Sequence, residues 1–199
     1  MTDPPPHLTG ADVGVLTTER LRLRLLTPDD LDAVHGYLSR PDVCRYLLHE
    51  PRTREQVAER LAEVAGRNAL RDTGDTVRLA VVRTENELVL GQIVIVVEQA
   101  GQSCVELGWI FHPDHGGRGY ATEAARAALA YAFETLTAHR VTASLHPDNE
   151  PSARLCRRLG MRQEAHHVDN WWIPDRGQWE DTAVFAILRR DWSGLGQSE

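Results

Sequence analysis

The chain has 199 residues, 42% of them hydrophobic and 26% charged, which is the composition of an ordinary globular domain with a substantial core. The formal net charge is −7 and no basic run appears, so nucleic acid is not expected as a ligand. No stretch approaches the roughly 18 apolar residues of a membrane-spanning helix, and the polar start is not that of a secretory signal. Three widely spaced cysteines favour free thiols in a reducing cytoplasm over a disulfide framework: Cys44, Cys104 and Cys156.

The chain divides into an arm, one domain and a tail. The Pro-rich and polar residues 1–16 predict a flexible arm, residues 17–192 a single domain, and residues 193–199 a C-terminal tail. At the start of the domain, arginine alternates with leucine from Arg20 to Leu26. This period of two predicts a half-buried strand.

Two helices follow this strand. The segment Thr27-Pro28-Asp29-Asp30 is typical of a helix N-terminus and predicts a helix that reaches about Ser39. Thr53 and Gln56 have the spacing of a capping box, which predicts a second helix over residues 54–70. Residues 41–48 lie between them and stay open as a short helix or a loop.

The second half of the chain alternates strands with two further helices. Three strands joined by polar turns predict an antiparallel meander, over residues 77–83, 88–98 and 104–111. Next come a helix (120–136), a strand (140–145), a helix from Asn149 to Gly160, and two strands (161–168 and 179–188). The order β-α-α-β-β-β-α-β-α-β-β predicts an α/β fold with a mixed, mostly antiparallel sheet and helices on both faces.

The stretch from Glu106 to Ala125 carries the main functional signal. Its strand contains Gly108, which suggests a bulge or a close backbone approach, and it ends at Pro113. A glycine turn then leads directly into a helix, whose free N–H groups and positive dipole end form a site for phosphate. Arg118 within the turn adds a guanidinium suited to phosphate oxygens.

The sequence HGGRGYATEA in this stretch resembles the acetyl-CoA-binding motif of the GNAT superfamily of N-acetyltransferases, usually written Q/R-x-x-G-x-G/A. Gly116 departs from the motif, because the family commonly has Gln or Arg there. The resemblance implies acetyl-CoA as donor, no metal, and a mixed sheet of the order given above. The residues that it assigns to the cofactor are Ile110, Phe111, Gly116, Gly117, Arg118, Gly119, Tyr120, Ala121, Asn149 and Ser152.

The resemblance extends over about residues 16–192 and is nearest to the branch of ribosomal-protein N-terminal alanine acetyltransferases. In that branch the strand reads like ELGWIF, and a later segment reads like N-x-x-S-x-R-L…LG[FM]. Here this later segment begins at Asn149 and Ser152, which in that branch face the pantetheine arm and the thioester. Helix capping is an alternative role for both residues, and the two roles can coexist.

The implied reaction is attack of a neutral amine on a thioester, which needs a base for the amine and an acid for the thiolate. Glu106 is the candidate base, directly or through water; the alternative is a solvated strand glutamate. Cys156 stands where many relatives keep a tyrosine acid, and a buried packing cysteine is the alternative to a proton donor. With Cys156 as packing, Ser152 or water has to protonate the thiolate. The catalytic set is therefore Glu106, Asn149 and Ser152.

Two further groups of residues suggest ligands. His112 and His115 flank a proline turn, which gives their rings no common face, so a metal site is not expected. Asp169, Trp171 and Trp172 lie in the segment that resembles the acceptor wall of the family. An acid beside two aromatics can hold an ammonium group, although the tryptophans can equally serve to cover the sheet.

The sequence thus predicts a cytoplasmic acetyltransferase that transfers acetyl from acetyl-CoA to a primary amine, with a peptide or protein N-terminal α-amine as the expected acceptor. The alternatives are an antibiotic or polyamine acetyltransferase and a catalytically weak acyl-CoA-binding module. The expected partners are acetyl-CoA and the amine, without nucleic acid or membrane. A homodimer is an assembly that the sequence leaves open.

Overall fold

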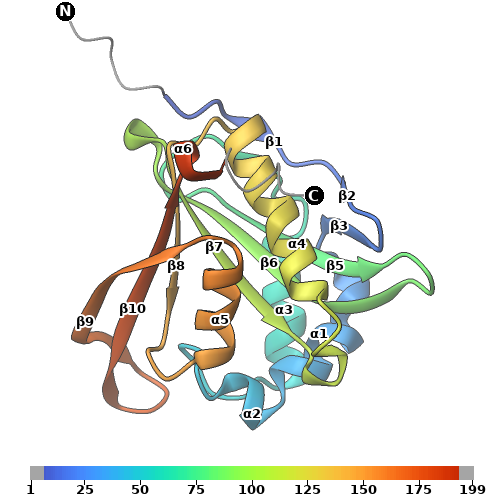
Figure 1. The fold of residues 1–199 in the computed structure, drawn as a ribbon. Helices are drawn as coiled ribbons and strands as arrows, with labels where there is room; N and C mark the ends of the chain where they lie inside the picture. Colours follow the sequence, from blue (N-terminus) through green and yellow to red (C-terminus); the bar gives the residue numbers. More distant parts are fainter. Residues whose placement is uncertain (1–6, 193–199) are drawn as a thin grey trace, which may run out of the picture.

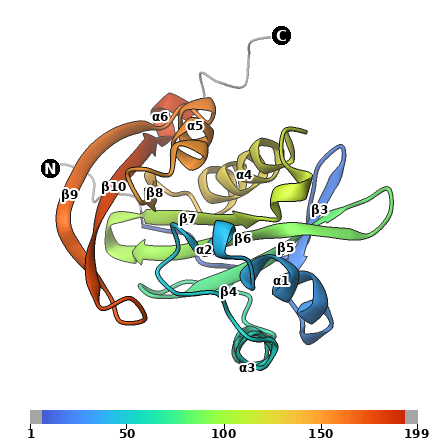
Figure 2. The same cartoon turned by 90° about the horizontal axis from the view of Figure 1, so that it is seen from below.

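The computed structural model describes residues 7–192, which form an eight-stranded sheet with helices on both faces (Figures 1 and 2). All neighbouring strands of this sheet are antiparallel except β7 and β8, which are parallel, so the predicted mixed sheet is confirmed. In spatial order the strands are β2 (Leu16–Thr17), β3 (Leu21–Leu25), β5 (Thr76–Arg83), β6 (Leu88–Gln99), β7 (Cys104–Phe111), β8 (Arg140–Leu145), β10 (Gln178–Leu188) and β9 (Arg162–Ile173).

The helices divide between the two faces of the sheet (Figure 2). One face carries α4 (Tyr120–Ala130), which continues into the π-helical turn η4 (Tyr131–Thr135), and α5 (Glu150–Arg158). The other carries α1 (Leu31–Leu38), the short α2 (Pro41–Cys44) and α3 (Arg54–Val64). The larger cluster of buried apolar side chains lies under α4 and α5, and the smaller one lies under α1 and α3. A last helical turn, α6 (Arg189–Trp192), follows β10.

The predicted capping box at the start of α3 is present. At the start of α3, the Thr53 N–H donates to the Gln56 side chain at 2.9 Å, and the Gln56 N–H donates to the Thr53 hydroxyl. The helix nevertheless ends at Val64, short of the predicted Leu70. Gly66 takes a left-handed backbone conformation (φ 73°), and Leu70 enters a strand instead.

That strand corrects the prediction of a flexible arm over residues 1–16. β4 (Ala69–Leu70) pairs with β1 (Ala11–Asp12), so a part of the predicted arm belongs to a two-stranded sheet. Val13 is buried in the main core, and the Thr9 N–H donates to the Leu136 carbonyl at 2.8 Å. Residues 1–6 of the arm and the predicted tail, 193–199, lie outside the described residues.

Gly108 does not form the predicted bulge. It pairs in register with Val94, and a Cβ added at Gly108 would meet the Val94 side chain at an ordinary 3.7 Å. The close backbone approach occurs at Gly91, where an added Cβ would lie 2.3 Å from the Ile110 carbonyl oxygen. The glycine that the strand packing demands is therefore on β6, opposite the end of β7.

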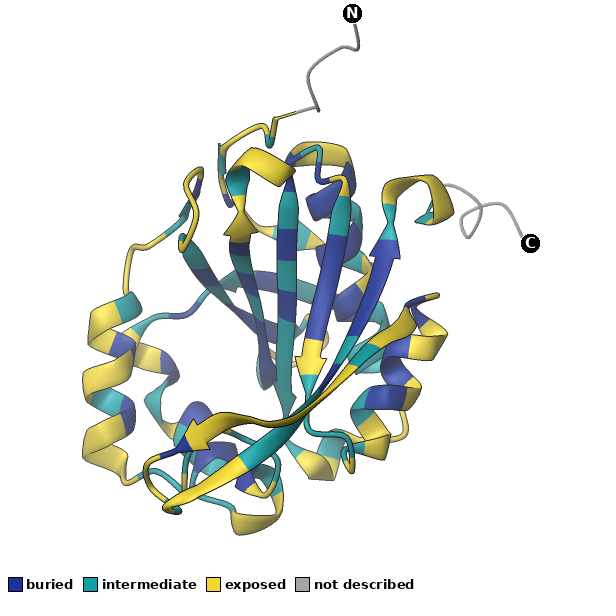
Figure 3. Ribbon diagram, turned by 90° about the vertical axis from the view of Figure 1, so that its left-hand side faces the viewer, coloured by how far each residue is buried: buried dark blue, intermediate teal, exposed yellow. Residues whose placement is uncertain are grey.

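The hairpin of β9 and β10 extends further than predicted. β9 continues to Ile173, beyond the predicted end at residue 168, and most of its residues are exposed (Figure 3). The pairing Trp172↔Trp179 keeps the ladder going near the hairpin end. This places Trp171 and Trp172 on a strand rather than in a loop.

Candidate active site

The sheet opens along the edge of β7. β7 and β8 pair only from Cys104↔Arg140 to Glu106↔Thr142, and beyond this point β7 has a strand partner only in β6. The residues Leu107–Phe111 therefore present main-chain N–H and C=O groups that no neighbouring strand satisfies on the β8 side. Such an edge is suited to an extended ligand that carries amide groups.

The glycine turn lies at the end of this open edge. The 3-10 turn η3 (Pro113–His115) leads into Gly116, and α4 begins at Tyr120. Gly117 and Gly119 have φ values of 75° and 80°, which explains why glycine stands at both positions. A Cβ added at Gly117 would meet nothing within 4 Å, so the backbone there is open to an approaching group. The helix N-terminus thus has the predicted geometry of an anion site.

Three residues that the motif alone did not indicate hold the turn in place. The Glu123 carboxylate on α4 accepts from the Thr18 hydroxyl at 2.6 Å, from the Arg20 N–H at 2.9 Å and from Arg20 Nε at 2.7 Å. Arg20 also donates to the Arg118 carbonyl at 3.1 Å and stacks over the Tyr120 ring at 4.8 Å. These contacts lower the pKa of the Glu123 carboxyl although burial alone would raise it. They tie the turn and the start of α4 to the segment between β2 and β3.

A groove of about 1050 Å³ runs along the turn and the start of α4. Of the predicted cofactor residues, Phe111, Gly116, Gly117, Gly119, Tyr120 and Ala121 line it. Arg118 is exposed and is not among the lining residues, so its contact with phosphate stays a prediction. Four other arginines line the groove: Arg20, Arg126, Arg154 and Arg158. The i, i+4 spacing of Arg154 and Arg158 on one face of α5 is the sequence signal that would have identified two of them.

The remaining predicted residues lie on opposite faces of β7. Phe111 lies on the α4 and α5 side, whereas the Ile110 side chain packs beneath α1 and α3. Trp109 shares the Phe111 face, and its Nε1 donates to the Ser152 hydroxyl at 3.2 Å. The Asn149 side chain accepts from the Ser152 N–H at 3.2 Å and caps α5. Asn149 and Ser152 therefore stand beside the open edge of β7, and the capping role of Asn149 is present.

Glu106 lies at the last paired position, where β7 and β8 separate. Its carboxylate accepts hydrogen bonds from the Ser144 side chain and N–H on β8. Burial raises the pKa of the Glu106 carboxyl above its ordinary value, and the nearby Glu98 raises it further, while the Ser144 hydrogen bonds oppose both effects. A half-buried carboxylate with a raised pKa is a better proton acceptor than a solvated one.

Cys156 is fully buried in the main core. Burial raises the pKa of its thiol to about 12, which leaves it a poor proton donor near neutral pH. The structure favours the packing role for this residue over the role of an acid.

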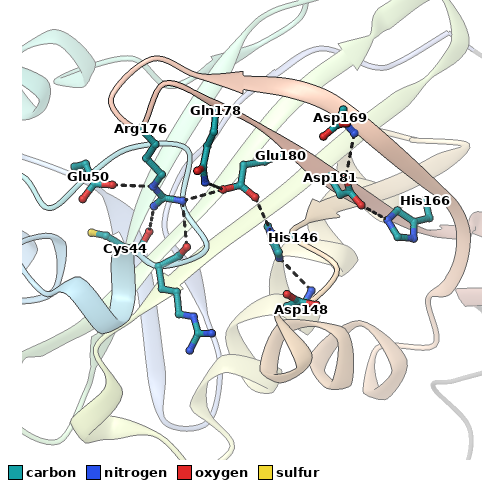
Figure 4. Close-up of polar contacts among 11 residues, drawn as sticks. Cys44, Glu50, His146, Asp148, His166, Asp169, Arg176, Gln178, Glu180 and Asp181 are labelled. Carbon is teal, nitrogen blue, oxygen red and sulfur yellow. Dashed lines mark hydrogen bonds and ion pairs between the residues drawn. The ribbon is translucent and has the colours of Figure 1, made fainter.

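The predicted acceptor residues are spread over β9. Trp172 contacts Trp179 edge to face at 5.5 Å, and Trp171 lies opposite Glu180 in the ladder. Both tryptophans are nearly half exposed, at 49% for Trp171 and 45% for Trp172. Asp169 is bound through its N–H to the Asp181 carboxylate at 2.9 Å (Figure 4). Its own carboxylate is therefore not held beside the two rings by any of these contacts.

A polar network joins the hairpin to α2 and to the end of β8 (Figure 4). Arg176, in the hairpin loop, donates to the Cys44 carbonyl and to the Glu50 carboxylate, each at 2.8 Å. Glu180 pairs with Nε2 of His146 at 2.9 Å. The Asp148 N–H donates to the other ring nitrogen of His146, so the proton of a neutral ring lies on Nε2. These residues line a second pocket of about 570 Å³.

The family model of the acetyltransferase (GNAT) domain matches residues 20–162, which include the strand edge, the glycine turn and the start of α5. The chain belongs to the GNAT acetyltransferases. The uncharacterized N-acetyltransferase YnaD of Bacillus subtilis (strain 168) is 32% identical over 89% of this chain and 99% of its own length. A crystal structure of a GNAT-family acetyltransferase from Bacillus anthracis has a TM-score of 0.77 at 30% identity, over 88% of this chain and 99% of that one.

Relatives with named acceptors differ in chemistry. The spermidine N(1)-acetyltransferase of Vibrio cholerae is 24% identical over 90% of this chain and 98% of its own length. The ribosomal protein uS5 alanine N-acetyltransferase of Escherichia coli (strain K12) is 34% identical, over 49% of each chain. The acetyltransferase described here therefore uses acetyl-CoA, as its family does, whereas these two relatives act on different classes of amine.

Two other features of the acetyltransferase concern metals and membranes. Within residues 7–192, His, Cys, Asp and Glu side chains form no group of three that is placed to hold a metal ion. The rings of His112 and His115 face each other at 5.2 Å without such a third partner in that part of the chain. The helices of the same residues are too short or too polar to cross a membrane.

Proposed function

We propose that this acetyltransferase acetylates the α-amine of a peptide or protein N-terminus, in the cytoplasm, with Glu106 as the base. The pyrophosphate of acetyl-CoA would lie on the glycine turn, with Arg20, Arg154 and Arg158 as its cationic partners. The pantetheine amides would pair with the open edge of β7. The match between this groove and a long, anionic, amide-containing donor supports the placement.

The half-buried Glu106 carboxylate at the point of strand separation is the observation that carries the proposal. Glu106 takes the proton of the attacking amine, directly or through water, as the nitrogen bonds to the acetyl carbon. The carbon–sulfur bond then breaks, and the thiolate of CoA takes a proton from water, either directly or relayed through the Ser152 hydroxyl, which regains its own proton from that water. Ser152 is suited to this position because Trp109 holds its hydroxyl beside β7.

The choice of an α-amine follows from the energetics of this modest set of groups. A lysine-like amine with a pKa near 10.4 costs roughly 4.6 kcal/mol to deprotonate at pH 7, whereas an α-amine near 7.8 costs about 1 kcal/mol. The Cys156 thiol, with a pKa of about 12, supplies no additional acid. A site with one carboxylate base is therefore better matched to an amine that costs little to deprotonate.

The test is release of free thiol from acetyl-CoA with a panel of peptides that differ in their first residue, with spermidine and an aminoglycoside for comparison. The proposal predicts that peptides have the highest kcat/KM and that blocking the peptide N-terminus abolishes turnover. Faster turnover of spermidine would assign the enzyme to the polyamine class. Tight acetyl-CoA binding without turnover of any amine would make the protein a binding module.

A further inference from the structure

Arg78 is a half-buried cation without a counter-charge among residues 7–192. It lies on β5, on the face of the sheet that α1 and α3 cover, and its Nε is buried without a hydrogen-bond partner. Among residues 7–192, no carboxylate lies within ion-pair distance of its guanidinium. Burial lowers its pKa, and the positive charge of Arg60 lowers it further. Burial of a charge is costly unless a partner of opposite sign compensates it.

A second donor next to Arg78 also lacks a partner. The Tyr37 side chain on α1 is fully buried, and its hydroxyl has no hydrogen-bond partner. Tyr37 and Arg78 are close enough to shift the pKa of each other. Buried polar atoms are nearly always hydrogen-bonded in native proteins, so each of these two donors calls for an acceptor.

The acceptor has room in a pocket of about 540 Å³ between α3 and the sheet. Arg78 and Gln92 line it from the strands, and Gln92 is 4% exposed. At the rim, Arg60 is already paired with Glu63 on the same helix at 2.8 Å. Arg52 also lines the pocket and is paired with Asp175 at 3.5 Å, and Glu59 lies on the lining as well. Among the arginines that line the pocket, Arg78 is the one with no carboxylate of the described residues beside it, so it is the cation that an anionic ligand would neutralise.

This pocket shares its face of the sheet with Glu106. Arg78 is in register with Val94, which is in register with Gly108, two residues from Glu106 on β7. Strand spacing and residue rise put the Cα atoms of Arg78 and Glu106 about 12 Å apart. Side chains two apart on a strand point to the same face, so Arg78 and Glu106 point to the same face of the sheet.

We propose that the pocket binds an oxyanion, a carboxylate or a phosphate, that belongs to the acceptor. The acceptor then carries its amine at Glu106 and a negative group at Arg78, whose planar fork suits such oxygens. The assignment to the acceptor rests on the proposed function, whereas anion binding itself does not. A compact acceptor such as a short peptide with a free carboxylate has this combination of groups, and spermidine does not.

Calorimetry on the full chain tests the anion site without turnover. Succinate and inorganic phosphate are titrated at constant ionic strength into the wild type, Arg78→Gln and a control, Arg22→Gln. Arg22 is also a partly exposed arginine on a strand, but it is paired with Glu87. We expect saturable binding to the wild type and the control, and at least tenfold weaker binding to Arg78→Gln. Binding that is absent from the wild type, or equal in Arg78→Gln, overturns the proposal. Tyr37→Phe, which removes one donor, should weaken binding severalfold if Arg78→Gln does not fold.

Kinetics with one peptide as its free acid and as its C-terminal amide identifies the source of the anion. If the acceptor supplies it, kcat/KM is at least tenfold higher for the acid in the wild type, and Arg78→Gln loses this preference. Equal rates for the two peptides, with succinate binding intact, would show a separate anion and overturn the assignment to the acceptor. Failure to turn over any peptide would refute the proposed acceptor class and leave the anion site standing.

Discussion

Replacement of Glu106 by Gln tests the role of the carboxylate as a base while it preserves the shape of the side chain. The variant keeps an oxygen that can accept from Ser144, but it removes the carboxylate that takes the proton. A positioned general base contributes about 10²- to 10⁴-fold, so kcat/KM at pH 7 should fall by that factor. The wild-type rate should also decrease as the pH falls through the raised pKa of Glu106, and the variant should lack this limb. Higher pH supplies neutral amine and should partly restore the variant.

The same pKa shift predicts the opposite effect on stability. Glu106 binds its proton more tightly in the folded chain, because its folded pKa is raised above the ordinary 4.5. Its contribution to the free energy of unfolding is therefore complete below 4.5 and is lost as the pH rises through the folded value. At pH 7 the charged carboxylate destabilises the fold, so Glu106→Gln should melt no lower than the wild type in a thermal scan.

Glu98→Gln is the matched control for this experiment. The Glu98 carboxylate accepts from the Thr142 hydroxyl at 3.1 Å, and its charge raises the pKa of Glu106. Its removal should shift the acid limb of the rate profile to lower pH while the rate at pH 7 stays near the wild-type value. A wild-type rate for Glu106→Gln from about pH 6 to 9 would refute the base, and proton removal would then fall to bulk water.

Three further changes test other parts of the site. Gly119→Asp places charge and bulk in the turn, at a residue whose φ is 80°. Calorimetry should show acetyl-CoA binding that is at least tenfold weaker, about 1.4 kcal/mol. The control Gly101→Asp adds its side chain in open space and should not weaken binding. Cys156→Ala should leave kcat within tenfold of the wild type, because a thiol with a pKa of about 12 donates poorly; a larger loss in steady-state kinetics would restore it as the acid. Arg176→Ala removes the contacts to Cys44 and Glu50. It should raise the KM for the acceptor without changing the affinity for acetyl-CoA, and hydrogen exchange at α2 should become faster. Unchanged exchange would contradict the idea that Arg176 holds α2 against the hairpin.

Features decided within one turn of chain could be predicted from the sequence. The cap of α3, the glycine turn and the helix after it each depend on neighbouring residues, and each is present in the structure. Helix ends were less predictable, because Leu70 left α3 to pair with a strand whose partner is distant in sequence. The same reason hid Arg20, which meets Glu123 across 103 positions. Arg118 was expected at the groove from its place in the motif, but its side chain faces solvent.

The donors of Arg78 and Tyr37 that lack a hydrogen-bond partner could not be predicted from the sequence either. In the sequence, Arg78 is a polar residue between the apolar residues of a strand, and Tyr37 is an aromatic residue of an amphipathic helix. Nothing local distinguishes them from a solvated arginine and a core tyrosine. Only the packing of α1 and α3 over β5 shows that two donors are buried together without an acceptor.

The alternation of side chains along β7 gives the proposed reaction its geometry. Trp109 and Phe111 face α4 and α5, the side that carries Ser152 and the groove along the glycine turn. Glu106 and Ile110 point to the opposite face, where Ile110 packs beneath α1 and α3. Under the proposed function, the donor and the acceptor therefore approach one strand from opposite faces and meet where β8 has separated from it. Gly108 lies between Glu106 and Ile110 on the acceptor face, where its missing side chain leaves space for the amine without any bulge in the ladder.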